Sequence, residues 1–267
     1  MLQKIEYSLA RILDRLMPRA VVKPMRDAWT QIRGNPEISV ARYLCDRSRL
    51  AVDAGANSGC FTHDLARYSA GCEAFEPNPT LVSFLKESCK GEAVRIHDCA
   101  LSDREQQTDL LLPSVDGNDY LALATIEPDN NFSGLEVRKI TVSCYPLDSF
   151  NLPPVGFIKI DVEGHELAVL KGAEATIARD EPNFLIEAEE RHKPGAVETL
   201  LNYFANRSYE GFFLLGRQIL PISEFSIERH QPASSIQFDK ILPGHIYVNN
   251  FIFTKDRAVI SKLQRGW

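Results

Sequence analysis

The sequence lacks any run of about 20 apolar residues, the length that a helix needs to cross a bilayer. Its first stretch, residues 1–18, is interrupted by charged side chains, so it does not have the apolar centre of a secretory signal. These two absences predict a cytoplasmic protein without a transmembrane segment.

Cysteine is scarce and scattered. No two of the six cysteines form a C-x-x-C pair; they stand at Cys45, Cys60, Cys72, Cys89, Cys99 and Cys144. This spacing excludes the usual zinc motifs and a disulfide scaffold, and it favours reduced, mostly buried thiols.

An excess of positive charge is also missing. The chain has 30 Lys and Arg against 36 Asp and Glu, a net charge of −6, which argues against a general nucleic-acid binder. Its 267 residues contain no internal repeat and no linker long enough to separate two large domains. We therefore predict an N-terminal helical extension over residues 1–35 and one domain over 36–267.

The extension begins with apolar residues at helical spacing, which predict an amphipathic helix over residues 2–17 that ends at Pro18. Its basic residues Lys4, Arg11 and Arg15 lie together on another side. Packing onto the domain or onto a second subunit, in a homo-oligomer, is the favoured interpretation. Weak contact with an anionic membrane surface is the alternative.

From residue 49 onward, short apolar runs alternate with helical stretches. The predicted strands are 50–54, 72–75, 93–96, 110–112, 140–145, 155–160, 184–188, 211–215 and 247–253. The predicted helices are 38–45, 61–68, 80–89, 167–178 with a break at Gly172, and 197–206. Such alternation predicts right-handed βαβ units, hence an α/β fold with a doubly wound, mainly parallel sheet.

Small residues and one acid mark a ligand site after the first two of these strands. Gly55 allows a sharp turn, and Gly59 lets the next helix begin close to a ligand. Glu76 ends the second strand, where a carboxylate can accept both hydroxyls of a ribose. The surrounding segment, which includes Asn78, is stiffened by prolines on both sides.

The same pattern serves dinucleotides and S-adenosylmethionine, and three features favour the latter. The loop reads G-x-x-x-G, without the three glycines that bring backbone against a pyrophosphate. Asp53 precedes it, where an anion repels phosphate but suits the cationic groups of S-adenosylmethionine. Asp98, after the third strand, is placed to accept from an adenine amino group.

A second cluster of ionisable residues ends the strand at 155–160. Asp161 is positioned to hold the methionine amino group or a substrate hydroxyl, and Glu163 and His165 are general-base candidates. Glu166 has a simpler role, because an acid in a first helical turn is stabilised by the helix dipole.

Three further acids follow the strand at 184–188: Glu187, Glu189 and Glu190. With Asp161 they offer oxygen ligands to a magnesium-type ion, a possibility that ranks second to a solvated acidic rim of the active site. We therefore predict no resident metal. Cys144, His192, His230 and His245 have no spacing that assigns them a role.

Taken in order, several blocks resemble the FkbM family of methyltransferases over about residues 36–254. The blocks are VDAGANSG, FEPNP, HDCALSD, LDSF, FIKIDVEGHELAVLKGA and NNFIF. The resemblance implies a class I methyltransferase fold, Rossmann-like, with a seven-stranded sheet whose last strand is antiparallel. It also implies O-methylation, often of sugars in polysaccharides, glycolipids or secondary metabolites. Residues 1–35 and 218–244 fall outside it.

The family pattern assigns the cofactor site to Asp53, Gly55, Asn57, Gly59, Glu76 and Asp98 to Ala100, which includes Cys99. The run at Asp161, Glu163, Gly164 and Glu166 matches its second hallmark. We therefore predict an S-adenosylmethionine-dependent O-methyltransferase acting on a small-molecule or glycan hydroxyl. A nicotinamide-dependent oxidoreductase and a non-catalytic S-adenosylmethionine-binding module are the alternatives.

Overall fold

The computed structural model describes residues 36–115, 118–119, 121–128, 132, 135–237 and 240–265. The predicted extension 1–35, with its helix at 2–17, lies outside the described residues. Within the part that is described, no helix is both long and apolar enough to span a bilayer.

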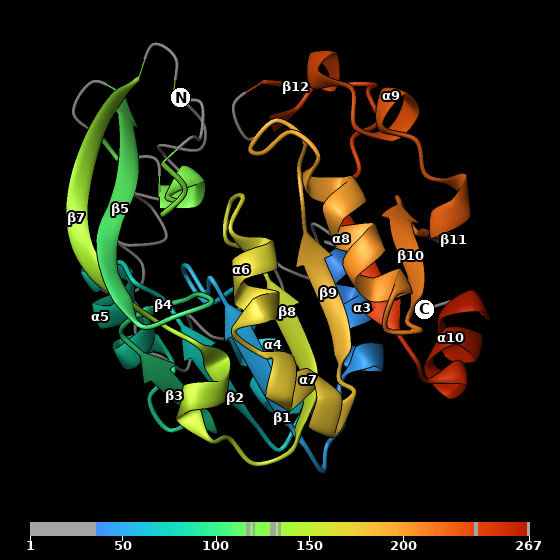
Figure 1. Ribbon diagram of the computed structural model, residues 1–267, viewed down its shortest axis with the longest axis horizontal. Helices are drawn as coiled ribbons and strands as arrows, with labels where there is room; N and C mark the ends of the chain where they lie inside the picture. The colour runs from blue at the N-terminus through green and yellow to red at the C-terminus, as the bar shows by residue number, and fades with distance from the viewer. Residues whose placement is uncertain are drawn as a thin grey trace, which may run out of the picture.

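An eight-stranded sheet forms the centre of the described structure (Figure 1). Across the sheet the strands are β11 (Gln218–Pro221), β10 (Glu210–Leu215), β14 (Asn250–Thr254), β9 (Asn183–Glu187), β8 (Val155–Ile160), β1 (Leu50–Ala54), β2 (Gly71–Phe75) and β3 (Val94–His97). Strand β14 is antiparallel to both neighbours and β11 to β10, whereas the other strands run parallel. The predicted doubly wound sheet with an antiparallel last strand is confirmed. The strand number is eight instead of seven, because the chain after β10 turns back as β11.

Helices cover both faces of this sheet, because successive strand residues point to opposite sides. On one face lie α3 (Pro36–Leu44), α4 (Thr62–Tyr68) and α10 (Arg257–Gln264); on the other lie α6 (Glu166–Lys171), α7 (Glu174–Asp180) and α8 (Ala196–Ala205). Strand β8 shows the alternation. Phe157 packs in the hydrophobic core under α3, α4 and α10, and Ile158 packs in the core under α6, α7 and α8. Helix α5 (Pro79–Ser88) packs through Leu85 against Ala74 of β2.

The break predicted at Gly172 separates α6 from α7. A Cβ at Gly172 would lie 1.9 Å from the Ser102 carbonyl oxygen, so only glycine permits this approach. Helix α10 was not predicted, although Asp256 caps it by accepting hydrogen bonds from Ala258 N at 2.7 Å and Val259 N at 3.3 Å.

A second, four-stranded sheet stands beside the carboxyl ends of the main strands (Figure 1). Its order is β4 (Ala100–Leu101), β7 (Glu136–Tyr145), β5 (Gln106–Val115) and β6 (Asn118–Asp119). The apolar runs predicted at 110–112 and 140–145 are thus the centres of two ten-residue strands that pair antiparallel. Between β6 and β7, residues 121–128, called the inner loop, fold back against β5 through the Leu111–Thr125 bridge.

Residues 222–237 and 240–249, called the cap, lie on the other side of the same edge (Figure 1). They contain η3 (Ile222–Glu224), α9 (Ile227–His230), η4 (Ala233–Ser235), β12 (Ile236–Gln237) and β13 (Lys240–Ile241). The buried Gln231 fixes the cap to the sheet: its Nε2 donates to the carbonyls of Ala188 at 2.8 Å and Val248 at 2.9 Å. A recess between the second sheet and the cap remains.

Candidate functional site

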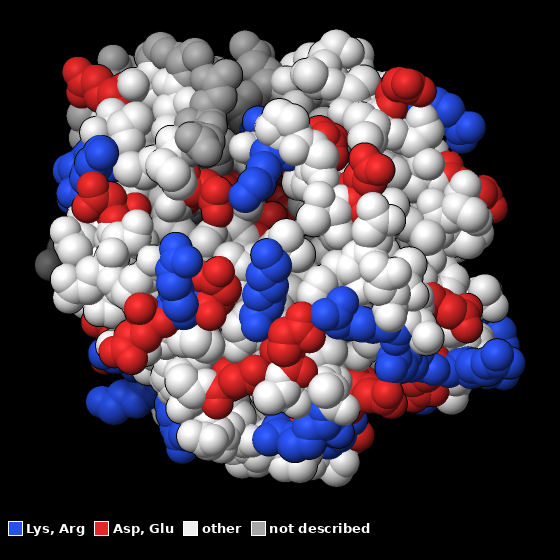
Figure 2. Space-filling view, in the orientation of Figure 1, with Lys and Arg blue, Asp and Glu red and all other residues white. Residues whose placement is uncertain are grey.

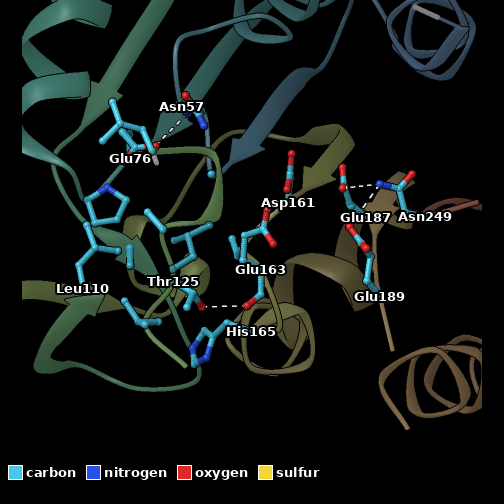
Figure 3. Close-up of a pocket in the computed structure, with 18 of the residues that line it drawn as sticks. Asn57, Glu76, Leu110, Thr125, Asp161, Glu163, His165, Glu187, Glu189 and Asn249 are labelled. Atoms are coloured by element: carbon cyan, nitrogen blue, oxygen red, sulfur yellow. Dashed lines mark hydrogen bonds between the residues drawn. The ribbon is translucent and has the colours of Figure 1, made fainter. Parts of the chain in front are cut away.

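A cavity of about 300 Å³ fills this recess above the ends of β1, β2, β8 and β9. Its size fits the range of ligand sites, and the carboxyl edge of a parallel sheet is where such folds bind ligands. Figure 2 shows acidic side chains in the hollow, and Figure 3 shows side chains that line it. The lining includes Gly55, Asn57, Glu76, Ala100, Leu110, Leu121, Thr125, Ile126, Asp161, Glu163, His165, Glu187, Glu189, Arg191, Ile236, Ile241, Tyr247 and Asn249.

Two loops cross at the floor of the cavity. Gly55 has a φ of +80°, and a Cβ there would stand 1.9 Å from the Asp161 carbonyl oxygen. Asp161 N in turn donates to Ala54 O at 3.0 Å. The loops that follow β1 and β8 are therefore in direct backbone contact, and glycine is required at position 55.

Glu76 stands at the end of β2, where the sequence placed it. One carboxylate oxygen accepts from Asn57 N and the other from Asn78 N, both at 2.8 Å. Burial raises the pKa of Glu76 to about 7, although the two N–H groups favour the ionised form. The carboxylate faces the cavity from a fixed position, as a ribose-binding acid must (Figure 3).

Polar atoms near Glu76 fit a nucleoside-like ligand. Asn57 has a φ of 49°, and its buried Oδ1 has no hydrogen-bond partner among the described residues. The same holds for the buried Nδ2 of Asn78, whose Oδ1 accepts from Thr80 N at 3.0 Å and begins α5. Since buried polar groups are normally paired, an acceptor and a donor beside Glu76 suit a polar ligand.

Several residues predicted to bind the cofactor are not among those that line the cavity. The 1% exposed Asp53 accepts from Thr62 Oγ1 at 2.7 Å and faces α4. Gly59 has a φ of +84° and packs on Leu85, whereas Asp98 is exposed. Cys99 is buried in the core, and only its neighbour Ala100 reaches the cavity. Asp53, Gly59, Asp98 and Cys99 therefore do not line the cavity.

Lys159, which the sequence analysis left without a role, lies beneath the cavity at 2% exposure. Its Nζ donates to Asp161 Oδ2 at 2.8 Å and lies 4.6 Å from the centre of the Phe61 ring. Burial acts to lower the pKa of Lys159, but the carboxylates of Asp161, Asp53 and Glu187 outweigh it and raise the pKa. A lysine inside an otherwise apolar strand was the signal in the sequence.

Glu163, two residues after Asp161, has a constrained backbone conformation. Its φ is 54°, an uncommon value for a residue with a side chain, and Gly164 follows with a φ of +103°. Thr125 Oγ1 of the inner loop donates to the Glu163 carbonyl at 2.8 Å (Figure 3). Glu163 Oε2 lies 2.7 Å from His192 Nε2, a partner that sequence spacing did not reveal.

Glu163 and His192 affect each other's ionisation. Burial raises the pKa of the Glu163 carboxyl, with neighbouring acids adding to the shift. Burial opposes protonation of His192, but the hydrogen bonds that its ring donates to Glu163 and Glu189 raise its pKa to about 9. A protonated His192 therefore neutralises this part of the acidic site near neutral pH.

His165 lines the cavity, but protein groups occupy both of its ring nitrogens. Nδ1 is hydrogen-bonded to Glu127 of the inner loop, and Nε2 lies 2.9 Å from Ser102 Oγ. Ser102 is fully buried, and Lys193 Nζ approaches Glu127 at 3.3 Å. This arrangement favours a positioning role for His165 over the general-base role that the sequence suggested.

Glu189 is the centre of a polar network at the cap side. Arg191 donates to it through Nε and Nη2, and Tyr247 Oη donates at 2.6 Å. Burial would raise the pKa of Glu189, but hydrogen bonds from His192 and Arg191 hold the pKa well below its usual range. Glu189 is therefore ionised, and its carboxylate oxygens interact with Arg191, Tyr247 and His192.

The predicted acids near Glu189 separate into different roles. Glu187 lines the cavity and accepts a hydrogen bond from Asn249 Nδ2 (Figure 3). Glu190 turns away: it accepts from Gly195 N at 2.7 Å and Val197 N at 3.0 Å at the start of α8. Glu190 is thus no ligand to an ion in the cavity. Within the described ranges, no three His, Cys, Asp or Glu side chains are grouped to hold a metal ion.

Glu166 has the structural role that the sequence favoured. Its Oε1 accepts from Gly164 N at 2.8 Å at the beginning of α6. Burial raises the pKa of Glu166 to about 7, with the Gly164 N–H acting against this shift. The carboxyl group fixes the turn that presents Glu163.

Comparisons with known proteins place most of the chain in one family. The model of the family described as "Methyltransferase FkbM domain" matches residues 53–210, more than half of the chain. "Methyltransferase 1" of Beauveria bassiana (strain ARSEF 2860) is 29% identical over 141 residues, which span 45% of this chain and 57% of that protein. The chain thus matches less than two thirds of this relative's length.

Two solved structures are also similar. Methyltransferase FkbM from Methylobacillus flagellatus KT aligns with 78% of this chain and 44% of its own, at 18% identity and a TM-score of 0.49. An O-methyltransferase from Bacillus cereus in complex with SAH aligns with 92% of this chain and 96% of its own, at 10% identity and a TM-score of 0.45.

Proposed function

The chain belongs to the FkbM family of methyltransferases, and from this premise we propose that it is an S-adenosylmethionine-dependent O-methyltransferase. The proposed acceptor is a hydroxyl of a small molecule, with a sugar of a polysaccharide, glycolipid or secondary metabolite as the preferred class. The observation that carries the proposal is one cavity with two polar ends, Glu76 at one and the Glu187–Asn249 pair at the other.

The end near Glu76 is the proposed cofactor site. Glu76 accepts the ribose hydroxyls, Asn57 offers a buried acceptor, and Gly55 keeps the floor open. Asp161 is assigned to the cationic methionine end, with Lys159 fixing its carboxylate. Asp98, Cys99 and Ala100 by the adenine remain a prediction. When bound, S-adenosylmethionine supplies an electrophilic methyl group on a sulfonium.

The other end is the proposed acceptor site. Glu163, Glu187, Asn249 and Tyr247 present carboxylate, amide and phenol groups to the cavity. Side chains of this kind bind neighbouring hydroxyls of a sugar through paired hydrogen bonds. Aliphatic side chains of the inner loop and cap close the walls and exclude water: Leu121, Ile126, Ile236 and Ile241.

The protein's contribution to methyl transfer is mainly alignment. Placing an acceptor oxygen in line with the reacting carbon can supply about 7–11 kcal/mol of the barrier. The backbone contact between Gly55 and Asp161 fixes the distance between the two sites, which this alignment requires. Glu163 and His165 hold the inner loop in place through their hydrogen bonds with Thr125 and Glu127. Ser102 fixes the other nitrogen of the His165 ring.

Ligand binding and turnover test the proposal together. S-adenosylhomocysteine is expected to raise the melting temperature, and NAD is not. Methyl glycosides and a soluble glycan extract then serve as acceptors, with S-adenosylhomocysteine release as the readout. Stabilisation by NAD alone would favour an oxidoreductase. Binding of S-adenosylhomocysteine without turnover of any acceptor would favour a non-catalytic module.

A further inference from the structure

We propose that Glu187 is the catalytic group that takes the proton from the acceptor hydroxyl, an inference that rests on the proposed function. In this step the acceptor oxygen forms a bond to the methyl carbon while that carbon's bond to sulfur breaks. The electron pair of the broken bond stays on sulfur, and the hydroxyl proton passes to the Glu187 carboxylate. The products are a methyl ether, S-adenosylhomocysteine and a protonated Glu187.

Among the cavity acids that follow β8 and β9, the distribution of cations singles out Glu187. Asp161 pairs with Lys159 at 2.8 Å, and Glu163 pairs with His192 at 2.7 Å. Arg191 pairs with Glu189 through two nitrogens. Among the described residues no ion pair includes Glu187, whose carboxyl group is bonded instead to the neutral amide of Asn249. A carboxylate without a cation is the strongest proton acceptor of such a set.

The position of Glu187 also suits the reaction. It ends β9, and β9 pairs in register with β8 through Ile160 and Ile186, so Glu187 and Asp161 follow adjacent strand ends. Both side chains line the cavity and lie near each other in Figure 3. A group beside Asp161 faces the junction between the proposed cofactor and acceptor ends.

The charges around Glu187 tune it for proton transfer. Burial has the largest effect and raises the pKa of Glu187 well above its ordinary value. The carboxylates of Asp161, Glu163 and Glu189 raise this pKa further, and the Lys159 ammonium lowers it. A general base works best when its pKa lies near the working pH, which an exposed glutamate does not achieve.

His165 is the main competing candidate. Its Nε2 faces the buried Ser102 hydroxyl and its Nδ1 faces Glu127. Neither nitrogen is therefore directed at the hydroxyl of a methyl acceptor. In this arrangement His165 positions the loop, and replacing it should disturb the inner loop more than proton transfer.

Glu187→Gln tests the inference, because it keeps the shape and the Asn249 contact but cannot take the proton. We expect S-adenosylhomocysteine binding within about threefold of wild type and a single-turnover rate with methyl glycosides lowered at least about 100-fold. Glu187→Asp should restore part of the rate. Glu210→Gln, on an exposed β10 residue away from the cavity, is the matched control.

The pH profile and infrared spectrum supply independent readouts. The wild-type rate should rise with pH as Glu187 ionises, and this rise should be absent in Glu187→Gln. The infrared carbonyl band of a protonated carboxyl group, followed against pH, should lose one component in the same variant. A Glu187→Gln protein that keeps the wild-type rate and the band overturns the inference.

The failure of the proposed function would look different. A wild-type protein that binds S-adenosylhomocysteine but turns over no acceptor would contradict the methyl-transfer proposal itself. The infrared titration then decides on Glu187 alone: a missing protonated component overturns the inference, and its presence supports it. If Glu187→Gln melts far below wild type, the Asp variant takes its place, with a changed pH profile as the expected result.

Discussion

At the scale of single residues, Glu76 combines loop structure with ligand binding, because its oxygens hold the backbone of two loops while facing the cavity. Glu76→Ala leaves the N–H groups of Asn57 and Asn78, and the ribose hydroxyls, without an acceptor. We expect it to lower S-adenosylhomocysteine affinity by about 1.5–3 kcal/mol. Titration calorimetry measures this, with Glu210→Ala as control. Unchanged affinity would remove Glu76 from the site.

The raised pKa of Glu76, about 7, predicts that cofactor affinity depends on pH. Ribose hydroxyls donate hydrogen bonds, so the ionised carboxylate binds them better than the protonated form. Affinity should therefore increase as the pH rises from about 6 to 8, where Glu76 loses its proton. Calorimetry across this range checks the trend, and Glu76→Gln should flatten it. A wild-type affinity independent of pH would contradict the prediction.

Single residues also show where sequence reasoning stopped. Glu76 and Gly55 follow local patterns, a strand end and a tight turn, and both lie where predicted. The partners His192 of Glu163 and Glu127 of His165 come from segments distant in the chain. Nothing in their own neighbourhood identifies them, since a pairing of this kind arises only after the chain folds.

At the scale of elements, the crossing of the loops after β1 and β8 predicts a specific cost for Gly55→Ala. Gly91→Ala is the matched control, because Gly91 also has a positive φ, +84°, but no described atom near its hypothetical Cβ. The free energy of unfolding should fall by about 1–3 kcal/mol more for Gly55→Ala than for Gly91→Ala. Urea unfolding measures both. Equal losses would show that the contact with Asp161 adds nothing.

The inner loop depends on the buried hydroxyl of Thr125, which donates to Glu163 O and accepts from Glu127 N. Thr125→Val keeps the shape and leaves both backbone groups without this partner. We expect a loss of about 1–3 kcal/mol in the free energy of unfolding. Thr141→Val on the exposed face of β7 should stay near wild type. A similar loss in both variants would contradict a special role for Thr125.

Elements with a strong local pattern were predicted well, and those made by distant pairing were not. The helices of the main domain have apolar faces of their own, and Gly172 marked the break between α6 and α7. In contrast, β5 and β7 look like two short apolar runs in the sequence, because the first four residues of each strand are mostly polar. Their antiparallel pairing, which builds one wall of the cavity, depends on contacts across the chain.

At the scale of the whole molecule, the ligand should stabilise the cavity edge more than the opposite edge. Binding at 100 times Kd adds about 2.7 kcal/mol to the stability of the folded state. We expect S-adenosylhomocysteine to slow hydrogen exchange at residues 53–59, 74–78 and 121–128, and to leave α10 nearly unchanged. Mass spectrometry of exchanged peptides measures this. Protection of α10 alone would place the ligand elsewhere.

The division of the cavity between floor and walls has a consequence for how such enzymes diversify. The ends of the main strands provide the floor, whereas residues 100–145 and the cap provide walls that are inserted between those strands. An insertion can be exchanged between related chains without altering the register of β1, β8 and β9. Under the proposed function, new acceptor preferences can therefore evolve by recombination of the walls, while the strand ends that carry Gly55 and Glu76 are inherited unchanged.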